Sequence, residues 1–441
     1  MFSIMIVVFV LGYICIALEH PLKINKAAFA LLLGVLLWTL FAFINPLALP
    51  AGSEYPQDSG TPFLTWLTHT ALIEHLGEIA EILFFLLGAM TIVELVDTHG
   101  GFGIITSRIK TTKKVPLMWI IALVTFFMSS VLDNLTTTIV MIALIRKLID
   151  NQKDRWLFGS IIVIAANSGG AWSPIGDVTT IMLWIAGKVS TLQIMQGIIL
   201  PSLVSLLLPL IVLSFTMKGT VSRPQKDVNK EHISLKIWER NLIFFMGVGL
   251  LLFVPIFKTL THLPPYLGIL GGLSVLWITT EILNRKRTIA EQGQFSVAVI
   301  LRKIDTSSIL FFLGILAAVA ALQACGHLAM LSGNLEKLPI EGQAKYDVIA
   351  MILGVLSSIV DNVPLVAGAI GMYDFPLDHQ FWEFMAYTAG TGGSMLIIGS
   401  AAGVAAMGME KINFIWYLKY VTPLALLGYV AGCGTYLLMV L

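Results

Sequence analysis

Charged residues are scarce in this sequence of 441 residues: Asp, Glu, Lys and Arg make up 12% of it, against 57% hydrophobic residues. Soluble domains carry about 25% charged residues, so the composition excludes an aqueous globular fold. An excess of positive charge is also missing, since the formal net charge is +1, and this argues against nucleic-acid binding. The sequence therefore predicts an integral membrane protein.

Cysteine is rare, and no basic segment precedes the first apolar run. Cys15, Cys325 and Cys433 lie far apart and form no zinc or CxxC spacing. Because the run Met5–Leu18 lacks the basic residues that begin a signal peptide, we expect it to be kept as a short membrane span.

Apolar runs of the length that crosses a bilayer, about 20 residues, recur along the chain. The uninterrupted ones are Met5–Leu18, Ala27–Ile44, Ile79–Leu95, Leu192–Met217, Asn241–Phe257, Tyr266–Leu283, Ser308–Ala324 and Asn413–Leu441. Two longer runs, 156–186 and 381–409, are interrupted by polar and glycine-rich patches and are expected to be broken helices. Two more, 116–145 and 347–372, carry an Asp-Asn pair at their centre.

Basic residues indicate that both Asp-Asn runs turn back inside the membrane. Lys and Arg concentrate in cytoplasmic loops, and two basic clusters flank the first run. These clusters are Arg108, Lys110, Lys113 and Lys114 before it, and Arg146, Lys147, Lys153 and Arg155 after it. A single crossing would place one cluster outside, whereas a re-entrant hairpin keeps both inside. The flanks of the second run hold only Lys337 and Lys345, so we expect that hairpin to enter from outside.

The predicted fold is therefore an all-α polytopic membrane protein with about ten spanning helices, two re-entrant hairpins and two broken helices. Both termini are expected outside, as is segment 45–78, which contains no Lys or Arg. The basic loops are expected inside: 19–26, 218–240 and 284–305.

Three motifs recur in the same order in the two halves of the chain. Ile82-Leu-Phe-Phe-Leu86 returns as 309–313, Ser129-Ser-Val-Leu-Asp-Asn134 returns with two substitutions as 357–362, and Asn167-Ser-Gly-Gly170 returns more weakly as 390–393. The offsets are 227, 228 and 223 residues. This order favours an inverted-repeat transporter, in which such repeats place the site at their interface.

The repeat sets the predicted organisation of the chain. Residues 1–217 form the first repeat, 218–240 a cytoplasmic linker, and 241–441 the second repeat. An odd number of crossings in each half turns the second half upside down relative to the first.

Three carboxylates are predicted at bilayer depth: Asp133 and Asp361 at the hairpin tips, and Asp177 within the first broken helix. Each costs at least about 2.5–3.5 kcal/mol there, and no Lys or Arg occurs in the same segments. Such anions must be protonated or bound to a cation, and repulsion between them couples their titration. This is the chemistry that a cation/proton exchanger needs.

A sodium ion prefers oxygen ligands, which broken helices and polar side chains supply. The candidate cation ligands are Asp133, Asn134, Asp177, Asp361, Asn362, Asn167, Ser168, Thr179, Thr180 and Ser394. For a single Ser or Thr, a hydrogen bond to its own helix is the commoner role. No catalytic residue and no cofactor is expected.

Four segments, 129–138, 166–180, 361–365 and 390–400, resemble the NhaD-type sodium/proton antiporters of the ion transporter superfamily. The resemblance extends over nearly the whole chain, and the long motif at 166–180 is its most specific part. It implies exchange of Na⁺ or Li⁺ for H⁺ across a bacterial inner membrane. It also implies a lipid-embedded homodimer with a scaffold domain and a moving transport domain. On this resemblance Asp133, Asn134, Asp177, Asp361 and Asn362 are functional positions.

Other readings remain open at this point. The same superfamily contains proton- or sodium-coupled carriers of organic anions or arsenite, although Asp at both hairpin tips suits a cation better. An intramembrane aspartyl protease also needs two membrane Asp residues, but Leu132 and Val360 precede the hairpin Asp residues where that family has Tyr or Gly. Composition alone would also allow a passive channel.

Overall fold

The computed structural model describes residues 2–17, 19–50, 52–57, 60–106, 109–224, 236–285, 295–337, 339–359 and 361–440. Every named element in this part of the chain is a helix, and Lys113 and Thr220 form an isolated bridge between extended segments. Most of the predicted linker (225–235) and part of a predicted inside loop (286–294) lie outside the described residues, as does Val360.

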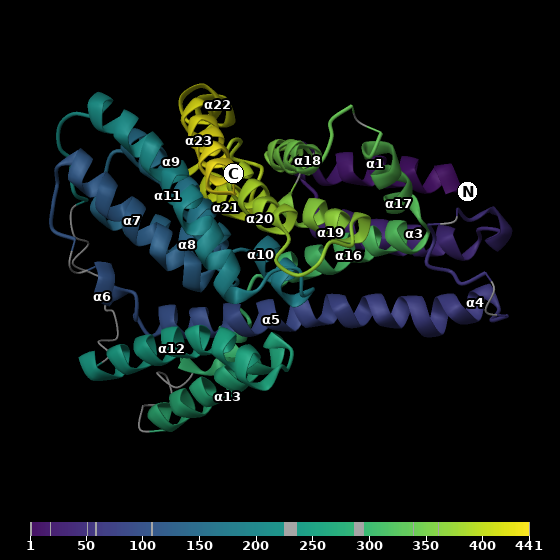
Figure 1. The fold of residues 1–441 in the computed structure, drawn as a ribbon. Coiled ribbons are helices and arrows are strands. Elements are labelled where there is room, and N and C mark those ends of the chain that lie inside the picture. Colours follow the sequence, from purple (N-terminus) through teal and green to yellow (C-terminus); the bar gives the residue numbers. More distant parts are fainter. Residues whose placement is uncertain are drawn as a thin grey trace. The chain divides into compact units, whose positions relative to one another are not determined.

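The helices of the first half are labelled in Figure 1 where there is room. They are α1 (Phe2–Ala17), α2 (Glu19–Leu22), α3 (Lys26–Ala42), α4 (Phe63–Trp66), α5 (Leu72–Thr98), α6 (Gly103–Thr106), α7 (Lys114–Leu132), α8 (Asn134–Leu148), α9 (Gln152–Ala171), α10 (Val178–Ile185) and α11 (Thr191–Thr216), with short turns η1 (Pro46–Ala48) and η2 (Leu67–Ala71).

The second half continues in the same order. Its helices are α12 (Ile237–Thr261), α13 (Pro265–Asn284), α15 (Val297–Leu301), α16 (Thr306–Ala324), α17 (His327–Leu335), α18 (Gln343–Leu356), α19 (Asn362–Met372), α20 (Gln380–Gly392), α21 (Ala401–Glu410), α22 (Phe414–Tyr420) and α23 (Thr422–Val440).

The chain forms two compact units, and each draws on both halves of the sequence. Unit one contains Met1–Leu86, Asp305–Ile349 and Val363–Pro376, and unit two contains Leu87–Ile304, Ala350–Asn362 and Leu377–Leu441. The units therefore differ from the predicted repeats 1–217 and 241–441, whose boundaries stay a prediction.

In unit one, α3 packs along α16 at a glycine contact. A Cβ built on Gly34 would lie 2.8 Å from the Gly314 carbonyl oxygen, so only glycine allows this approach. Trp38 Nε1 donates to the Ala317 carbonyl oxygen at 2.9 Å on the same interface. Near the end of α16, Glu54 accepts hydrogen bonds from Gln323 (2.9 Å) and from His75 (3.0 Å). Burial alone would raise the pKa of Glu54, but these hydrogen bonds bring it below its usual value.

In unit two, α7 and α8 form the first hairpin, with one residue between them. Asp133 takes φ 68° and ψ 162°, which ends α7, and its carboxylate accepts the Thr136 N–H (2.8 Å) to begin α8. The start of α7 and the end of α8 lie at the same end of this hairpin, which we call its open end. Lys114 at the start of α7 pairs at 2.6 Å with Asp154, in the first turn of α9, the helix that follows α8.

The second hairpin consists of α18 and α19, with residues 357–359 and 361 at its tip. Its open ends are held together by aromatic rings: the Tyr346 ring lies 5.8 Å from that of Tyr373 and 4.9 Å from that of Phe375. The predicted hairpins and broken helices are thus present as helical elements, with ends a few residues from those expected.

The two hairpins meet the broken helices through matching contacts. Ser129 Oγ donates to the Ala166 carbonyl oxygen (2.6 Å), and Ser357 Oγ donates to the Ala389 carbonyl oxygen (2.8 Å). Likewise a Cβ on Gly169 would overlap the carbonyl oxygen of residue 126, and one on Gly392 would overlap that of residue 354. The partners have the sequence offsets of the motifs, so the repeat extends to tertiary structure.

Helix α11 packs against α23 across a proline. Pro209 has no N–H, so it leaves the Ser205 carbonyl oxygen without its helix hydrogen bond. Gly428 of α23 approaches that oxygen so closely that a Cβ would overlap it. The small residues of a Gly-Tyr-Val-Ala-Gly segment, 428–432, therefore set the distance between the two helices.

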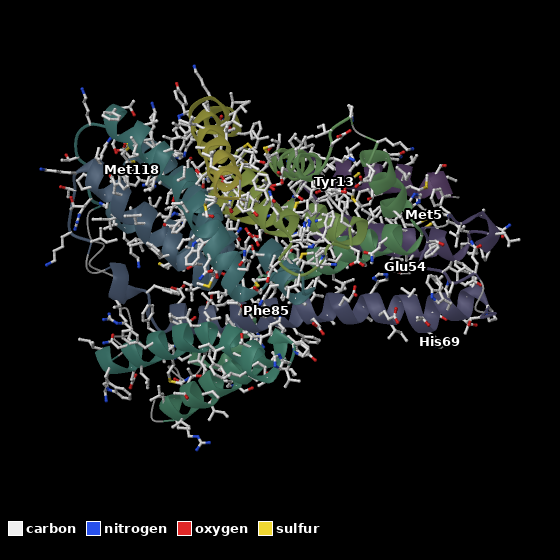
Figure 2. All side chains as sticks on the ribbon, in the orientation of Figure 1. Met5, Tyr13, Glu54, His69, Phe85 and Met118 are labelled. Atoms are coloured by element: carbon white, nitrogen blue, oxygen red, sulfur yellow. The ribbon has the colours of Figure 1, made fainter. Side chains whose placement is uncertain are left out.

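Seven helical segments in the described residues are long and apolar enough to cross a membrane. They are 63–98, 114–132, 191–216, 237–261, 265–284, 306–324 and 422–440. Side chains project from the helices on their outer sides (Figure 2). Large apolar ones such as Phe215, Phe245 and Leu438 are exposed. This surface suits lipid contact, and the chain is a multi-pass membrane protein. The number of ten spans stays a prediction, since α7 qualifies by length but is a hairpin arm.

Two of the predicted span boundaries were wrong. The third span does not begin at Ile79, because helix extends back through α5 and α4 to Phe63. The acidic residues of that stretch lowered its hydropathy but do not interrupt a helix. The last run, 413–441, is divided at Val421 into α22 and α23, since Thr422 and Pro423 begin a new helix.

We expect Gly169→Ala to prevent folding, because its methyl group would overlap the backbone of α7. The matched control is Gly408→Ala in α21, where a Cβ would meet nothing within 4 Å and where alanine favours the helix by about 1 kcal/mol. Size-exclusion chromatography and thermal unfolding in detergent measure both. A Gly169→Ala protein with the elution volume and unfolding midpoint of the wild type would contradict this packing.

Candidate functional site

Asp177 lies at the break between α9 and α10. Its backbone is extended (φ −144°, ψ 145°), and Oδ1 accepts the Thr179 N–H (3.0 Å) and hydroxyl (2.9 Å), which begins α10. The break is compact because Gly170 and Gly176 approach each other too closely for any Cβ. Only 1% of Asp177 is exposed, so its carboxylate is held away from water at a helix N-terminus.

Asparagines from both hairpins converge on this carboxylate. Asn134 Nδ2 donates to Asp177 Oδ2 at 2.6 Å, and Asn362 Nδ2 lies 3.4 Å from Asp177 Oδ1. All hydrogen bonds that the structure gives to Asp177 thus come from neutral groups. A buried carboxylate without a basic partner binds a proton or a cation more readily than one in an ion pair.

Asn167 connects the two broken helices. Its Nδ2 donates to Ser394 Oγ and to Ser400 Oγ, both at 2.9 Å, and its Oδ1 accepts from Asn134 at 3.1 Å. The side chain therefore links α9 to the break between α20 and α21 and also to the first hairpin. The N-termini of α8, α10, α19 and α21 begin at residues of this cluster or next to it.

The other two predicted carboxylates have different environments. Asp133 is 9% exposed, and both its oxygens contact Thr136, through the N–H (2.8 Å) and the hydroxyl (2.8 Å). Asp361 is half-buried and directly precedes α19. Like charges interact across the site, because Asp133 and Asp361 each lie close enough to Asp177 for mutual repulsion.

The predicted hydroxyl ligands divide into two groups. Ser168 Oγ donates to the Ile164 carbonyl oxygen of its own helix (2.6 Å), and Thr179 is engaged with Asp177. In contrast, the buried hydroxyl of Thr180 has no hydrogen-bond partner among the described residues, and neither do those of Thr137 and Thr138, one turn from Asn134. Unsatisfied buried oxygens of this kind are suited to a cation.

Sequence reasoning missed two buried carboxylates, Glu383 and Glu410, and the capping role of Ser400. Ser400 caps α21 by accepting the Gly403 N–H (3.1 Å) and occupies, at the motif offset of 223, the position equivalent to Asp177. Glu383 and Glu410 are 4% exposed each. Both were visible as carboxylates within or at the end of the apolar run 381–409, which is the signal that would have identified them.

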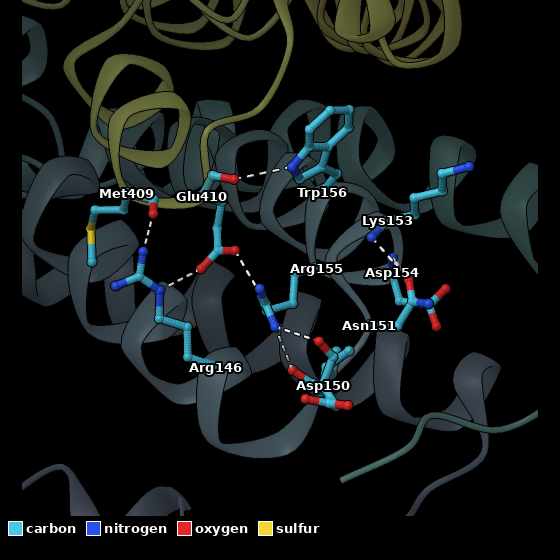
Figure 3. Close-up of polar contacts among 10 residues, drawn as sticks. Arg146, Asp150, Asn151, Lys153, Asp154, Arg155, Trp156, Met409 and Glu410 are labelled. Carbon is cyan, nitrogen blue, oxygen red and sulfur yellow. Dashed lines mark hydrogen bonds and ion pairs between the residues drawn. The ribbon is translucent and has the colours of Figure 1, made fainter. Parts of the chain in front are cut away.

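Glu410 anchors the end of α21 to α8 and α9 (Figure 3). Its carboxylate pairs with Arg146 Nε at 2.5 Å and with Arg155 Nε at 2.8 Å, and its carbonyl oxygen accepts from Trp156 Nε1 at 3.0 Å. Arg146 also donates to the Met409 carbonyl oxygen. This cluster fixes the second broken helix to the open end of the first hairpin.

Two halves with equivalent contacts and broken helices, meeting at a buried carboxylate, are typical of an ion-coupled membrane transporter. A family model described as citrate transporter (CitMHS) matches residues 13–390. Sodium/proton antiporter 1 of Arabidopsis thaliana is 47% identical, over 98% of this chain and 72% of its own length. Sodium/proton antiporter 2 of the same plant is 43% identical over 98% of both chains, and the Na⁺/H⁺ antiporter NhaD of Vibrio cholerae is 32% identical over 98% of this chain and 91% of its own. The chain belongs to the CitMHS family and, within it, to the NhaD-type antiporters.

We expect Glu410→Gln to lower stability, because Arg146 and Arg155 would lose their carboxylate. Arg146 is 46% exposed, so water screens part of the loss, and about 1.5–3 kcal/mol is expected. The control is Glu336→Gln, since the Glu336 side chain is 40% exposed and pairs with Lys345 alone among basic residues in the described part of the chain. Thermal unfolding of both variants in detergent tests this, and equal midpoints for the two would refute an anchoring role for Glu410.

Proposed function

We propose that this protein exchanges Na⁺, or Li⁺, for H⁺ across a membrane, with Asp177 as the group that binds the two ions in turn. The single observation that carries this proposal is the buried Asp177 carboxylate, whose hydrogen bonds come from Asn134, Asn362 and Thr179 and, within the described part of the chain, from no basic residue. The sodium/proton antiporters among its relatives support the same ions.

Exchange follows from the charge of this site. With Na⁺ bound, the ion compensates the charge of Asp177; without it, a proton does. Each asparagine amide carries an oxygen as well as an NH₂ group, so a rotated Asn134 or Asn362 would offer that oxygen to the cation. The hydroxyls of Thr137, Thr138 and Thr180 are further oxygen ligands within the buried region.

Asp133 and Asp361 add negative charge to this site. Each repels the negative charge of Asp177, and this repulsion increases the affinity of Asp177 for a positive ion. Cation binding and proton release are coupled in this way. Asp133 also stabilises the hairpin turn, because both of its carboxylate oxygens accept hydrogen bonds from Thr136. Asn167 and Ser394 position the broken helices, and Ser168 stabilises its own helix.

The alternative from the sequence, a carrier of organic anions or arsenite, fits this site less well. Helix N-termini attract anions, and several begin here. However, Asp177 already places a carboxylate at these N-termini, and a second anion would be repelled. The family model described as citrate transporter keeps this alternative worth testing on the same preparation.

The location of the protein and its oligomeric state are further parts of this proposal. We place the protein in a bacterial inner membrane, although its relatives include plant as well as bacterial proteins. The exchange requires only a membrane with a proton gradient. A homodimer within the lipid stays a prediction from the family resemblance.

We expect Asp177→Asn to abolish the exchange, because a neutral amide cannot alternate between proton and cation. The rate should fall by about tenfold at the least, the effect of losing one charged hydrogen-bonding group. Everted vesicles from a strain without its own antiporters give the measurement. Respiration acidifies the interior, and a fluorescent probe reports whether NaCl, LiCl or KCl collapses the gradient.

Asp361→Asn, measured alongside, should also lower the rate, and Asp305→Asn is the control. Asp305 is an exposed residue that caps α16 far along the sequence from the site. Exchange by Asp177→Asn at the wild-type rate would refute the role of Asp177. A wild type without any Na⁺- or Li⁺-dependent proton movement would refute the exchange itself, and citrate and arsenite would then be assayed on these vesicles.

A further inference from the structure

Glu383 is a buried carboxylate that the proposed exchange at Asp177 does not use. It lies in the first turn of α20 and is 4% exposed. Glu410, which is equally buried, pairs with two arginines. Glu383 has no ion pair with Lys, Arg or His among the described residues, so its negative charge has no positive partner there.

The groups around Glu383 are neutral hydrogen-bonding groups. Tyr436 Oη of α23 lies 3.2 Å from Glu383 Oε2 and also 3.2 Å from the Gln380 carbonyl oxygen. Its single proton can satisfy only one of these oxygens at a time. The side chain of Gln193, an exposed residue of α11, also hydrogen-bonds to Glu383.

The nearest charged groups do not neutralise it. Asp378, just before α20, adds repulsion, and its carboxylate accepts the Ser190 N–H. Lys188 Nζ lies over the ring of Trp382, 5.2 Å from its centroid. His379 accepts the Phe381 N–H at Nδ1. α10 contains no charged residue, and those of α9 are in its first turn.

Helix α11 is shaped to receive this carboxylate. A Cβ on Gly197 would lie 2.7 Å from Glu383 Oε2, so a larger residue would displace the carboxylate. One turn further on, Pro201 has no N–H to donate to the Gly197 carbonyl oxygen. The carboxylate therefore rests on a turn whose backbone oxygen lacks its helix hydrogen bond.

Glu383 lies between the end of unit two and the proposed ion site. Gly390, where α20 reaches the site, is seven residues further along, or about 10 Å at 1.5 Å per residue. The start of α20 meets the start of α11, where the Asp378 N–H donates to the Lys188 carbonyl oxygen. The Glu410 cluster lies at the opposite end, where the segment after α11 bonds to Lys114.

We propose that Glu383 is a second proton-binding site, which exchanges protons with the surface at the start of α20 and is required for proton movement to and from Asp177. The first part stands on the geometry of Glu383 alone, and the second part rests on the proposed exchange. A proton on Glu383 removes the uncompensated charge and lets the carboxyl donate to a neighbouring oxygen. The ligand is H⁺, held by one carboxyl, one phenol and one amide.

The test compares Glu383→Gln with Glu78→Gln, a control whose side chain is 76% exposed. Purified protein in vesicles of phosphatidylethanolamine and phosphatidylglycerol is studied by infrared difference spectroscopy between acid and alkaline pH. We expect the carbonyl band of a protonated buried carboxyl in the wild type and in Glu78→Gln, and a loss of its Glu383 component in Glu383→Gln. An unchanged band in Glu383→Gln overturns the proton site, whatever ion the protein carries.

Na⁺-driven proton movement in the same vesicles tests the second part. We expect Glu383→Gln to lower the maximal rate by about tenfold or more, with little change in the Na⁺ concentration for half-maximal rate. A structural role alone would leave the rate of this isosteric variant unchanged, and that result overturns the role in transport. If the wild type moves no protons with Na⁺, the exchange fails while the infrared band still decides Glu383.

Tyr436→Phe keeps the carboxyl and provides a second variant should Glu383→Gln not fold. Loss of the phenol removes a donor to the ionised carboxylate, so we expect the infrared band to persist to higher pH. A band that titrates as in the wild type would show that the titrating carboxyl receives no hydrogen bond from Tyr436, and would overturn the site as described.

Discussion

A carboxylate inside a membrane protein must have its charge compensated, and the architecture of unit two depends on how this is done for Asp177. Four helices begin at residues of the cluster around it or next to them, which brings the positive ends of their dipoles and their free N–H groups to one region. Helix breaks and hairpin tips produce those N-termini at depth, where an unbroken helix has none. The glycines at 170, 176, 392 and 399 then allow the backbones to approach. Because the compensation comes from dipoles and amides and not from a fixed cation, it is partial, and a mobile cation or proton can complete it.

The two repeats supply the same framework but different chemistry. Ser129 and Ser357 make equivalent hydrogen bonds to the broken helices, and Asp177 and Ser400 have the same extended backbone and the same capping role. Yet only the first repeat has a carboxylate at this position, and only the first has Asn167 where the second has Gly390. The site is therefore asymmetric within a symmetric scaffold. Asn167 contributes to this asymmetry, since its amide in the first repeat hydrogen-bonds to Ser394 and Ser400 in the break of the second.

Two other buried carboxylates show how differently the same side chain can be used. Glu410 is held by two arginines and joins α21 to the first hairpin, so it stiffens one end of the unit. Glu383, near the other end, has neutral partners and a glycine-lined position on α11. A paired carboxylate keeps its charge, whereas one with neutral partners is free to change it. The two ends of unit two thus differ in how their buried carboxylates are compensated.

The sequence by itself determined the class of protein, the helical segments, the two hairpins and the repeat, because these follow from hydropathy, basic-residue placement and recurring motifs. It also predicted Asp133, Asn134, Asp177, Asp361 and Asn362 as candidate site residues. It misplaced the start of the helix ending at Thr98 and the division at Val421, since hydropathy does not record where a helix ends. Only the tertiary structure decided that Asp177 is the point of convergence and that Asn167 bridges both breaks. These facts depend on contacts between residues 33 to 233 positions apart, which no local pattern specifies.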